Sequence, residues 1–216
     1  MKNYLNTLLF VFLLVMATGC TEDDTVMPKI DTTLPDAFPA IFYEGFSRPA
    51  PATFNFENWT KFAQTGSKNW FLNNYQGSDA VTNHYLEFSS FGSGDASNIG
   101  WIISPAINLD TITATGLKKR LAFQSAQHHA VSAENKFELL VSSNFDGTNV
   151  LSATWTVLPF RLPTYSSATN YDFVNSGGVD LSAYQGNIHI AFRVTGNGTS
   201  NSNLTGGFQI DNINVF

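Results

Sequence analysis

Large apolar residues recur at every second position in several stretches of the chain, most clearly in 137–142 and 188–194. Successive side chains of a strand point to opposite faces of a sheet, so this period predicts half-buried strands. No helical period extends beyond about one turn. Composition and spacing predict further strands at 41–46, 53–57, 69–72, 85–90, 99–103, 120–125, 154–160, 170–174 and 207–216.

Glycine, asparagine and serine separate these stretches, as in 92–94, 146–147 and 196–198. Such clusters are typical of tight turns, and many short strands joined by turns favour a two-sheet β-sandwich. A closed barrel is the alternative architecture. The predicted strands are too short, and the chain too plainly tethered at its start, for an outer-membrane barrel.

The first twenty residues have the pattern of a secretory signal. Lys2 is followed by an apolar run over 8–16 and by small residues up to Gly19, which predicts a signal peptide at 1–19. Residues 17–20 resemble a lipobox, which predicts that Cys20 becomes the lipidated first residue of the mature protein. An ordinary signal peptide beside an incidental cysteine is the alternative.

Residues 20–40 are predicted to be the lipidated cysteine followed by a flexible tether. The acidic run 21–24 resembles the surface-export signal of Bacteroidetes lipoproteins, or is simply a solvated linker, and three prolines follow it by residue 39. We therefore expect one domain at 41–216, anchored by lipid to the outer membrane and exposed at the cell surface.

Composition narrows the classes of function. Hydrophobic residues make up 43% of the chain, enough for a sizeable core, but charged residues make up only 13%, and the net charge is −6. An acidic chain without basic clusters argues against nucleic-acid binding. Cys20 is the single cysteine, so no disulfide can form within the chain.

The first and last predicted strands each carry a carboxylate beside apolar residues. Strand geometry places Glu44 on the same face as Phe42 and Phe46. It places Asp211 on the same face as Ile213 unless a bulge intervenes. A buried carboxylate needs a cation or several hydrogen-bond donors. We therefore expect Glu44 and Asp211 to share a structural Ca²⁺, with Asp79 or Asn58 as further ligands. The alternative is that both lie at strand ends and meet water or Arg193.

Several short motifs follow one another along the chain: 42–46, Trp59, 69–70, 100–109, 140–147, 153–158, 179–184, 190–194 and 210–213. Together they resemble the motifs of choice-of-anchor J domains and of the related cleaved adhesin domains of Bacteroidetes. The resemblance implies a jelly-roll, galactose-binding-like sandwich, often with structural calcium, on secreted or surface proteins. Relatives occur in adhesins or accompany glycan uptake, so the family indicates architecture more than ligand.

The sequence contains no catalytic signature that we can identify. It lacks a Gly-x-Ser-x-Gly elbow and a His-Glu-x-x-His motif. His128 and His129 are adjacent, and neighbouring strand residues face opposite ways, so we do not expect them to bind one metal ion together. We expect a protein that is not an enzyme.

Aromatic residues beside polar loops are the candidate ligand-binding residues. Trp59, Tyr75, Tyr165 and Tyr171 lie near stretches rich in asparagine and serine, so we expect their rings to be exposed. Exposed aromatic rings can stack on the C–H faces of sugars. Loop composition that merely aids solubility is the alternative. We expect a module that binds an extracellular glycan or a surface protein. A structural adhesin subunit without sugar affinity, or a glycan-acting hydrolase, are the rivals.

Overall fold

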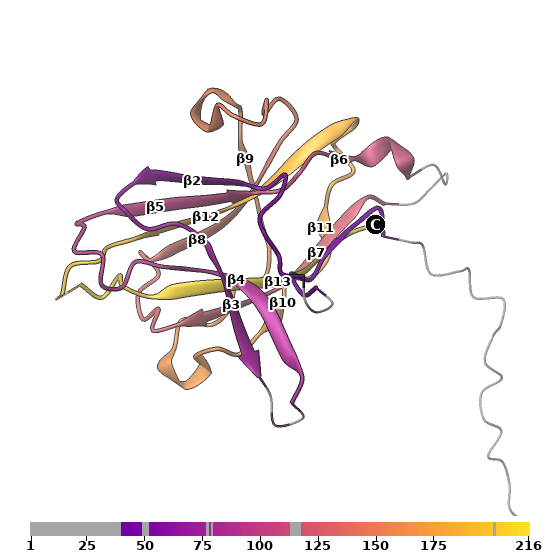
Figure 1. The fold of residues 1–216 in the computed structure, drawn as a ribbon. Helices are drawn as coiled ribbons and strands as arrows, with labels where there is room; N and C mark the ends of the chain where they lie inside the picture. The colour runs from indigo at the N-terminus through magenta and orange to yellow at the C-terminus, as the bar shows by residue number, and fades with distance from the viewer. Residues whose placement is uncertain (1–39, 49–51, 77, 79, 113–117, 201) are drawn as a thin grey trace, which may run out of the picture. The chain divides into compact units, whose positions relative to one another are not determined.

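The computed structural model describes residues 40–216 except 49–51, 77, 79, 113–117 and 201 (Figure 1). The predicted signal peptide, Cys20, all but the last residue of the tether and Asp79 lie outside the described residues. No described segment forms a helix long and apolar enough to cross a membrane.

The described chain is built from short antiparallel strands. Three single-turn 3₁₀ helices lie between them: η1 Leu109–Thr111, η2 Val150–Ser152 and η3 Ser167–Thr169. The strands are β1 Phe42–Glu44, β2 Thr60–Thr65, β3 Phe71–Gln76, β4 Thr82–Ser89, β5 Asn98–Ile103, β6 Ile107–Asn108, β7 Arg120–His128, β8 Lys136–Ser142, β9 Thr156–Leu158, β10 Val174–Asn175, β11 Val179–Asp180, β12 Asn187–Gly196 and β13 Gly207–Val215.

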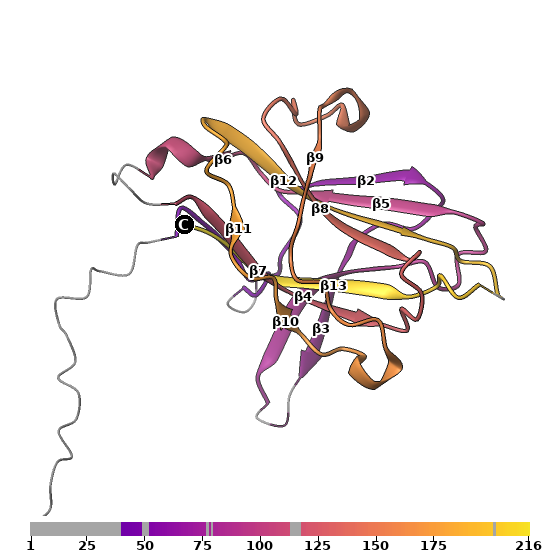
Figure 2. The same ribbon diagram turned by 180° about the vertical axis from the view of Figure 1, so that it is seen from behind.

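These strands form two sheets that pack face to face (Figure 1). The first sheet has the order β10-β7-β13-β4-β3, with β1 beside β13 and β11 beside β7, and the second has the order β2-β5-β12-β8-β9, with β6 beside β12. Between β9 and β10 the chain crosses from the second sheet to the first (Figure 2). The predicted all-β jelly-roll sandwich is therefore confirmed.

The core between the sheets is rich in phenylalanine. Phe123 of β7 meets Phe192 of β12 edge to face with 4.9 Å between ring centroids, and Phe137 of β8 stacks on Phe208 of β13 at the same distance. Both pairs join one sheet to the other. Aromatic rings in such arrangements add packing energy beyond the area that they bury.

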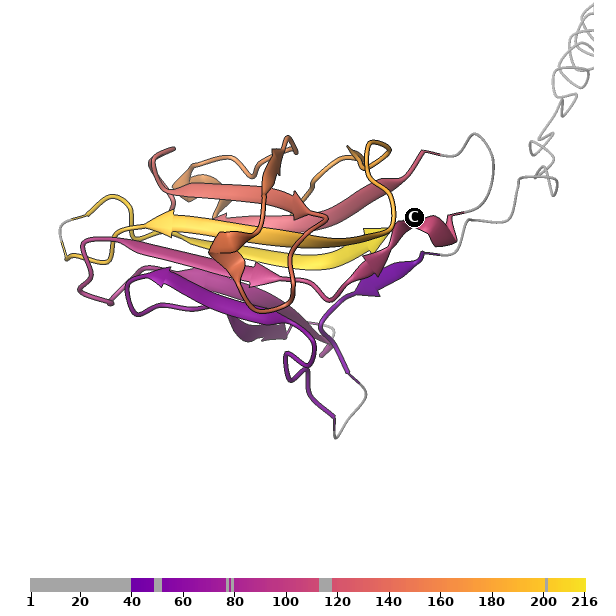
Figure 3. The ribbon, with the colours of Figure 1, turned by 90° about the horizontal axis from the view of Figure 1, so that it is seen from above.

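The outer face of the second sheet is covered by the loop that follows β8. Figure 3 looks down on this sheet and shows the loop crossing above its strands. Trp101, Leu140 and Val150 belong to a second apolar cluster here, and Trp155 packs against it. The loop therefore packs against the outer face of the second sheet through apolar side chains.

Most predicted strands are present, and the errors have local causes. Residues 53–57 are not a strand, because Phe56 and Asn58 have φ angles of 62° and 64°, which a strand does not accommodate. The strand β2 at 60–65 was not predicted, because it is polar and half-exposed along most of its length.

Candidate functional site

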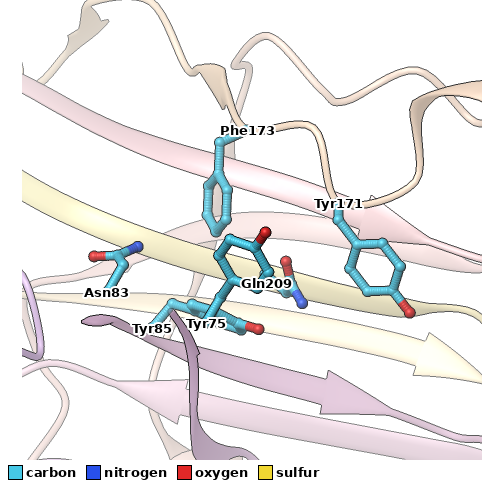
Figure 4. Close-up of a pocket in the computed structure, with 6 residues that line it drawn as sticks. All are labelled: Tyr75, Asn83, Tyr85, Tyr171, Phe173 and Gln209. Carbon is cyan, nitrogen blue, oxygen red and sulfur yellow. The ribbon is translucent and has the colours of Figure 1, made fainter. Parts of the chain in front are cut away.

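A hollow on the outer face of the first sheet gathers aromatic and amide side chains, as Figure 4 shows. Its volume is about 560 Å³, which lies within the range of sites for small molecules, roughly 300–1,000 Å³. We call it the aromatic pocket. It is lined by Tyr75, Asn83, Tyr85, Tyr171, Phe173 and Gln209.

Strand register builds the floor of the aromatic pocket. Tyr75 of β3 pairs with Asn83 of β4, and Gln209 of β13 pairs with Glu87 of β4. Residues 83, 85 and 87 alternate with the core residues Leu86 and Phe88, so they point to the outer face. Tyr85 and Gln209 are buried at the base of the pocket, whereas Tyr75 is 68% exposed.

The wall of the aromatic pocket comes from the segment that links η3 to β10. Phe173 meets Tyr85 edge to face with 5.7 Å between centroids, and Tyr171 is 53% exposed. Tyr171 has a φ angle of 67°, and its N–H donates to the carbonyl of Gln127. A non-glycine residue in this conformation requires support from its surroundings, so the ring of Tyr171 is held in a defined place.

A buried carboxylate beneath the pocket anchors its floor. Glu87 Oε2 accepts hydrogen bonds from Gln209 Nε2 at 2.8 Å and from Asn73 Nδ2 at 3.0 Å, and Glu87 Oε1 lies 3.2 Å from His128 Nε2. Burial raises the pKa of Glu87, but the bonds from His128, Gln209 and Asn73 outweigh it, so the pKa is lowered. The charged carboxylate therefore fixes the orientation of three neighbouring side chains.

Tyr85, the phenol in the floor of the pocket, has a raised pKa, in contrast to Glu87. Desolvation raises the pKa of Tyr85, and the nearby charge of Glu87 raises it further. Tyr85 thus keeps its hydroxyl proton at neutral pH. Among the described residues, the lining contains phenols, amides and one phenyl ring and no charged side chain, which suits a neutral ligand rather than an ionic one.

Two of the four predicted ligand-binding aromatics lie together in the aromatic pocket, namely Tyr75 and Tyr171. The prediction that Trp59 is exposed is wrong. Its ring packs against Phe42, Phe46 and Phe54, and only 9% of the residue is exposed. The left-handed turn at residues 56–58 swings Trp59 into the core.

Tyr165 is also placed differently from the expectation of an exposed ring. It packs on Phe208 with 5.9 Å between centroids, and its hydroxyl donates to the carbonyl of Asn135 at 3.2 Å. Burial raises the pKa of Tyr165. The ring and the hydroxyl of Tyr165 thus both have partners within the protein. Tyr165 does not line the aromatic pocket.

The other four lining residues were not predicted from the sequence. Asn83 and Tyr85 alternate with apolar positions of β4, so their shared face could have been found from the period of that strand. Phe173 and Gln209 come from segments far along the chain and meet the others only through β-sheet pairing. No sequence pattern signals that meeting.

The two predicted calcium ligands lie on neighbouring strands, as expected. β1 pairs with β13, with Glu44 opposite Ile213, and Glu44 and Asp211 are both buried. The Glu44 carboxylate has a cation partner in Arg48, whose Nη1 and Nη2 donate at 2.8 Å and 2.7 Å, and it also accepts from the Phe46 N–H. Arg193, the alternative cation partner, bonds to Glu138 instead.

The direction of the Asp211 side chain is set by a bulge in β13 and not by regular strand alternation. The register between β13 and β7 shifts between Asp211 and Asn214, and Asn212 has a φ angle of 50°. Ile210, Ile213 and Val215 all lie in the core, so this bulge turns Asp211 away from the face of Ile213. Strand geometry places the two residues on one face unless a bulge intervenes, and a bulge is present here.

Asp211 is stabilised by amides rather than by a basic side chain. Asn83 Nδ2 donates to Asp211 Oδ2 at 2.9 Å, and the Asn212 N–H donates to Oδ1 at 2.7 Å. Burial raises the pKa of Asp211, and the charge of Glu44 raises it further. A cation beside Asp211 would offset both effects, and Ca²⁺ prefers carboxylate and carbonyl oxygens, but both oxygens of Glu44 already accept hydrogen bonds from Arg48.

A hollow of about 410 Å³ lies beside Glu44 and does not include Asp211 in its lining, which is formed by Tyr43, Glu44, Gly45, Ser47, Arg48, Asn83 and Asn212. Asn58, predicted as a further ligand, is exposed in the turn before β2 and does not line this hollow. The described residues hold no group of three or more histidine, cysteine, aspartate or glutamate side chains that could bind a metal. Calcium at Glu44 and Asp211 thus stays a prediction.

Comparison with known proteins gives likeness of fold alone. The sequence matches no protein-family model and no curated protein. Among solved structures, the K1 cleaved adhesin domain of Lys-gingipain from Porphyromonas gingivalis W83 is 18% identical, with 81% of this chain and 96% of that chain covered and a TM-score of 0.47.

Two further solved structures are similar to this chain at a comparable level. The K2 cleaved adhesin domain of Lys-gingipain is 17% identical over 81% of this chain and 98% of that chain, with a TM-score of 0.48. The module TmCBM61, solved in complex with β-1,4-galactotriose, is 12% identical over 74% of this chain and 89% of that chain, with a TM-score of 0.39. Similarity at this level says nothing about which residues bind a ligand.

Proposed function

We propose that this protein is a non-catalytic module that binds a neutral extracellular glycan in the aromatic pocket. The observation that carries the proposal is the set of side chains that meet there: four aromatic rings with two amides between them. Sugar rings present apolar C–H faces that pack on aromatic rings, and they present hydroxyl groups that pair with amides.

The three tyrosine rings of the pocket have different roles in this proposal. Tyr75 and Tyr171 are exposed and offer their faces to the ligand, whereas Tyr85 is buried and forms the floor. Asn83, at the edge, and Gln209, at the base, supply amides beside these rings (Figure 4). Because Glu87 holds the Gln209 amide in place, the site is preorganised and loses little side-chain entropy when a ligand binds.

The carboxylates near the pocket support binding rather than hydrolysis. Glycosidases of the usual kind need two carboxyl groups that flank the sugar bond. Glu87 and Asp211 are buried and engaged with amide donors, and neither lines the aromatic pocket. The arrangement favours a binding module over the rival hydrolase.

We further propose that the domain belongs to a surface lipoprotein of the choice-of-anchor J type. The signal-like start and the lipobox-like residues before Cys20 support lipid attachment, with the outer membrane as the location. A structural Ca²⁺ at Glu44 and Asp211 is part of this proposal. It would tie the first strand to the last.

The glycan proposal is tested on a glycan array with the wild-type protein and three variants. Tyr75→Ala and Tyr171→Ala each remove an exposed ring of the pocket. Leu151→Ala is the control, because Leu151 is 65% exposed on the loop that covers the other sheet. We expect the wild type and the control to bind the same neutral glycans, and both tyrosine variants to bind them weakly.

Two outcomes would count against the proposal. If no glycan on the array binds the wild type, the aromatic pocket is not a sugar site. In that case the structural adhesin subunit becomes the better account, and co-purification with another surface protein would support it. If glycans bind equally to all four proteins, the sugar site lies elsewhere on the chain.

A further inference from the structure

His128 and His129 bring their ring nitrogens together at the end of β7. The two Nδ1 atoms are 3.1 Å apart. Adjacent residues of a regular strand point in opposite directions, but β7 ends at His128 and His129 has a φ angle of 54°. This left-handed residue turns the second ring back towards the first, so the expectation that the pair cannot share one ion does not apply here.

Several contacts fix the two rings in this arrangement. The His129 N–H donates to Asn170 Oδ1 at 2.8 Å. The ring of Tyr171 stacks on His128 at an interplanar angle of 11° and meets His129 edge to face. Two non-glycine residues with positive φ, His129 and Tyr171, thus pack against each other. Such strain persists where the surrounding structure enforces it, often at functional sites.

Glu87 determines which nitrogen of His128 is free. Glu87 Oε1 lies 3.2 Å from His128 Nε2, and a carboxylate only accepts hydrogen bonds, so Nε2 carries a proton. The lone pair of neutral His128 is then on Nδ1 and points towards His129. A carboxylate behind a histidine is the usual outer partner of a metal-binding imidazole, because it fixes the tautomer and orients the ring.

We propose that His128 Nδ1 and His129 Nδ1 together bind one divalent transition-metal ion such as Zn²⁺. Metal–nitrogen distances of about 2.0–2.1 Å place two ligands about 2.9 Å apart at a right angle and about 3.3 Å apart at the tetrahedral angle. The observed 3.1 Å lies between these values. Imidazole nitrogen favours zinc, nickel and copper over calcium.

The space over the two rings leaves room for the remaining ligands. A pocket of about 320 Å³ lies there, which we call the histidine pocket, lined by Phe91, His128, His129, Tyr171 and Thr205. The described residues offer no third histidine, cysteine, aspartate or glutamate to the pair, so water or a bound molecule completes the coordination. The site is therefore an open one. Without metal, the same two nitrogens share a hydrogen bond, with the proton on His129 Nδ1.

Calorimetric titration of the untagged full chain with Zn²⁺, in excess Ca²⁺ to fill any carboxylate site, tests the proposal. We expect one zinc ion per wild-type chain and no detectable binding to His129→Asn, since asparagine accepts a positive φ. Glu87→Gln should weaken binding by about 10- to 100-fold. His189→Gln is the control, because the His189 ring bonds to the Ser104 carbonyl on the other sheet, and it should bind as the wild type does.

Nitrogen-15 NMR of the histidine rings gives a second readout that does not depend on affinity. Zinc should shift the Nδ1 signals of His128 and His129 and leave those of His84 and His189 in place. Absence of zinc binding to the wild type would overturn the proposal. So would undiminished binding to His129→Asn, a variant whose fold is checked by its circular dichroism spectrum.

Discussion

The ring of Tyr171 stacks on the imidazole of His128, with 5.0 Å between their centroids. Tyr171 lines both the aromatic pocket and the histidine pocket, whereas Tyr75 lines only the first and His129 only the second. The two proposed sites are thus neighbours that share one side chain. Changes at Tyr75 and at His129 can separate their functions.

The first prediction uses this separation. Tyr75→Ala should weaken glycan binding and leave zinc binding unchanged, because Tyr75 has no part in the histidine pocket. His129→Asn should abolish zinc binding and leave glycan binding unchanged. Paired calorimetric titrations of both variants check this. If either variant lost both activities while keeping its fold, the two pockets would form a single site.

The second prediction concerns calcium. If Ca²⁺ binds between Glu44 and Asp211, then calcium at about 100 times its Kd stabilises the fold by about 2.7 kcal/mol. For a domain of this size that corresponds to a rise in Tm of roughly 5–10 °C, reversed by EDTA. Differential scanning calorimetry measures it directly.

Two variants show where the calcium acts. Asp211→Asn removes one carboxylate at nearly constant shape, so its Tm should not respond to calcium. Glu138→Gln removes a different carboxylate, which pairs with Arg193 on the other sheet, so its response should match that of the wild type. A wild-type Tm that neither calcium nor EDTA changes would rule out the ion.

The third prediction concerns acid stability. Asp146 accepts bonds from the N–H groups of Asn149 and Thr148 at 2.7 Å and 2.8 Å, and these bonds, with that from Asn149 the largest cause, hold the pKa of Asp146 far below its usual range. A lowered pKa means that the stabilisation is complete above the ordinary value of about 3.9 and is lost as the pH falls below it.

Asp146→Asn keeps an acceptor at this position but no longer titrates. Urea midpoints of the wild type and the variant should therefore differ at pH 5 and converge as the pH falls towards 2. The loop containing Asp146 also carries Val150 into the second apolar cluster, so fluorescence of the adjacent Trp155 is a local probe. A difference that does not change with pH would contradict the assignment.

The fourth prediction concerns the packing of the two sheets. A Cβ atom on Gly100 of β5 would overlap the ring of Phe88 on β4, and Phe88 is fully buried. Gly100→Ala should destabilise the fold by about 1–3 kcal/mol, as overpacked cores are. In Gly178→Ala the new Cβ would be 3.3 Å from the flexible side chain of Arg120, so its Tm should stay near that of the wild type.

The sandwich can be predicted from the sequence because the alternation of apolar and polar residues within a strand depends only on residues that are close together in the chain. The strands 137–142 and 188–194 are found almost exactly where their period places them, as β8 and β12. The neighbouring positions of the first and last strands also follow from the sandwich architecture, and β1 does pair with β13. In these cases local pattern and tertiary structure agree.

The sequence fails where single residues leave the regular backbone. Phe56, His129 and Asn212 all have positive φ, and each changes the direction of nearby side chains. Trp59 becomes buried, two histidine rings meet, and Asp211 leaves the face of Ile213. Asparagine favours this conformation, but phenylalanine does not, so only the tertiary structure reveals these turns.

The most direct test of the account is the affinity of the wild type and of Tyr75→Ala for the neutral oligosaccharide that binds best, measured by isothermal calorimetry. Loss of one stacking ring costs about 1 kcal/mol, which raises the Kd roughly fivefold, and Leu151→Ala should leave the Kd unchanged. An equal Kd for the wild type and Tyr75→Ala would contradict glycan binding in the aromatic pocket.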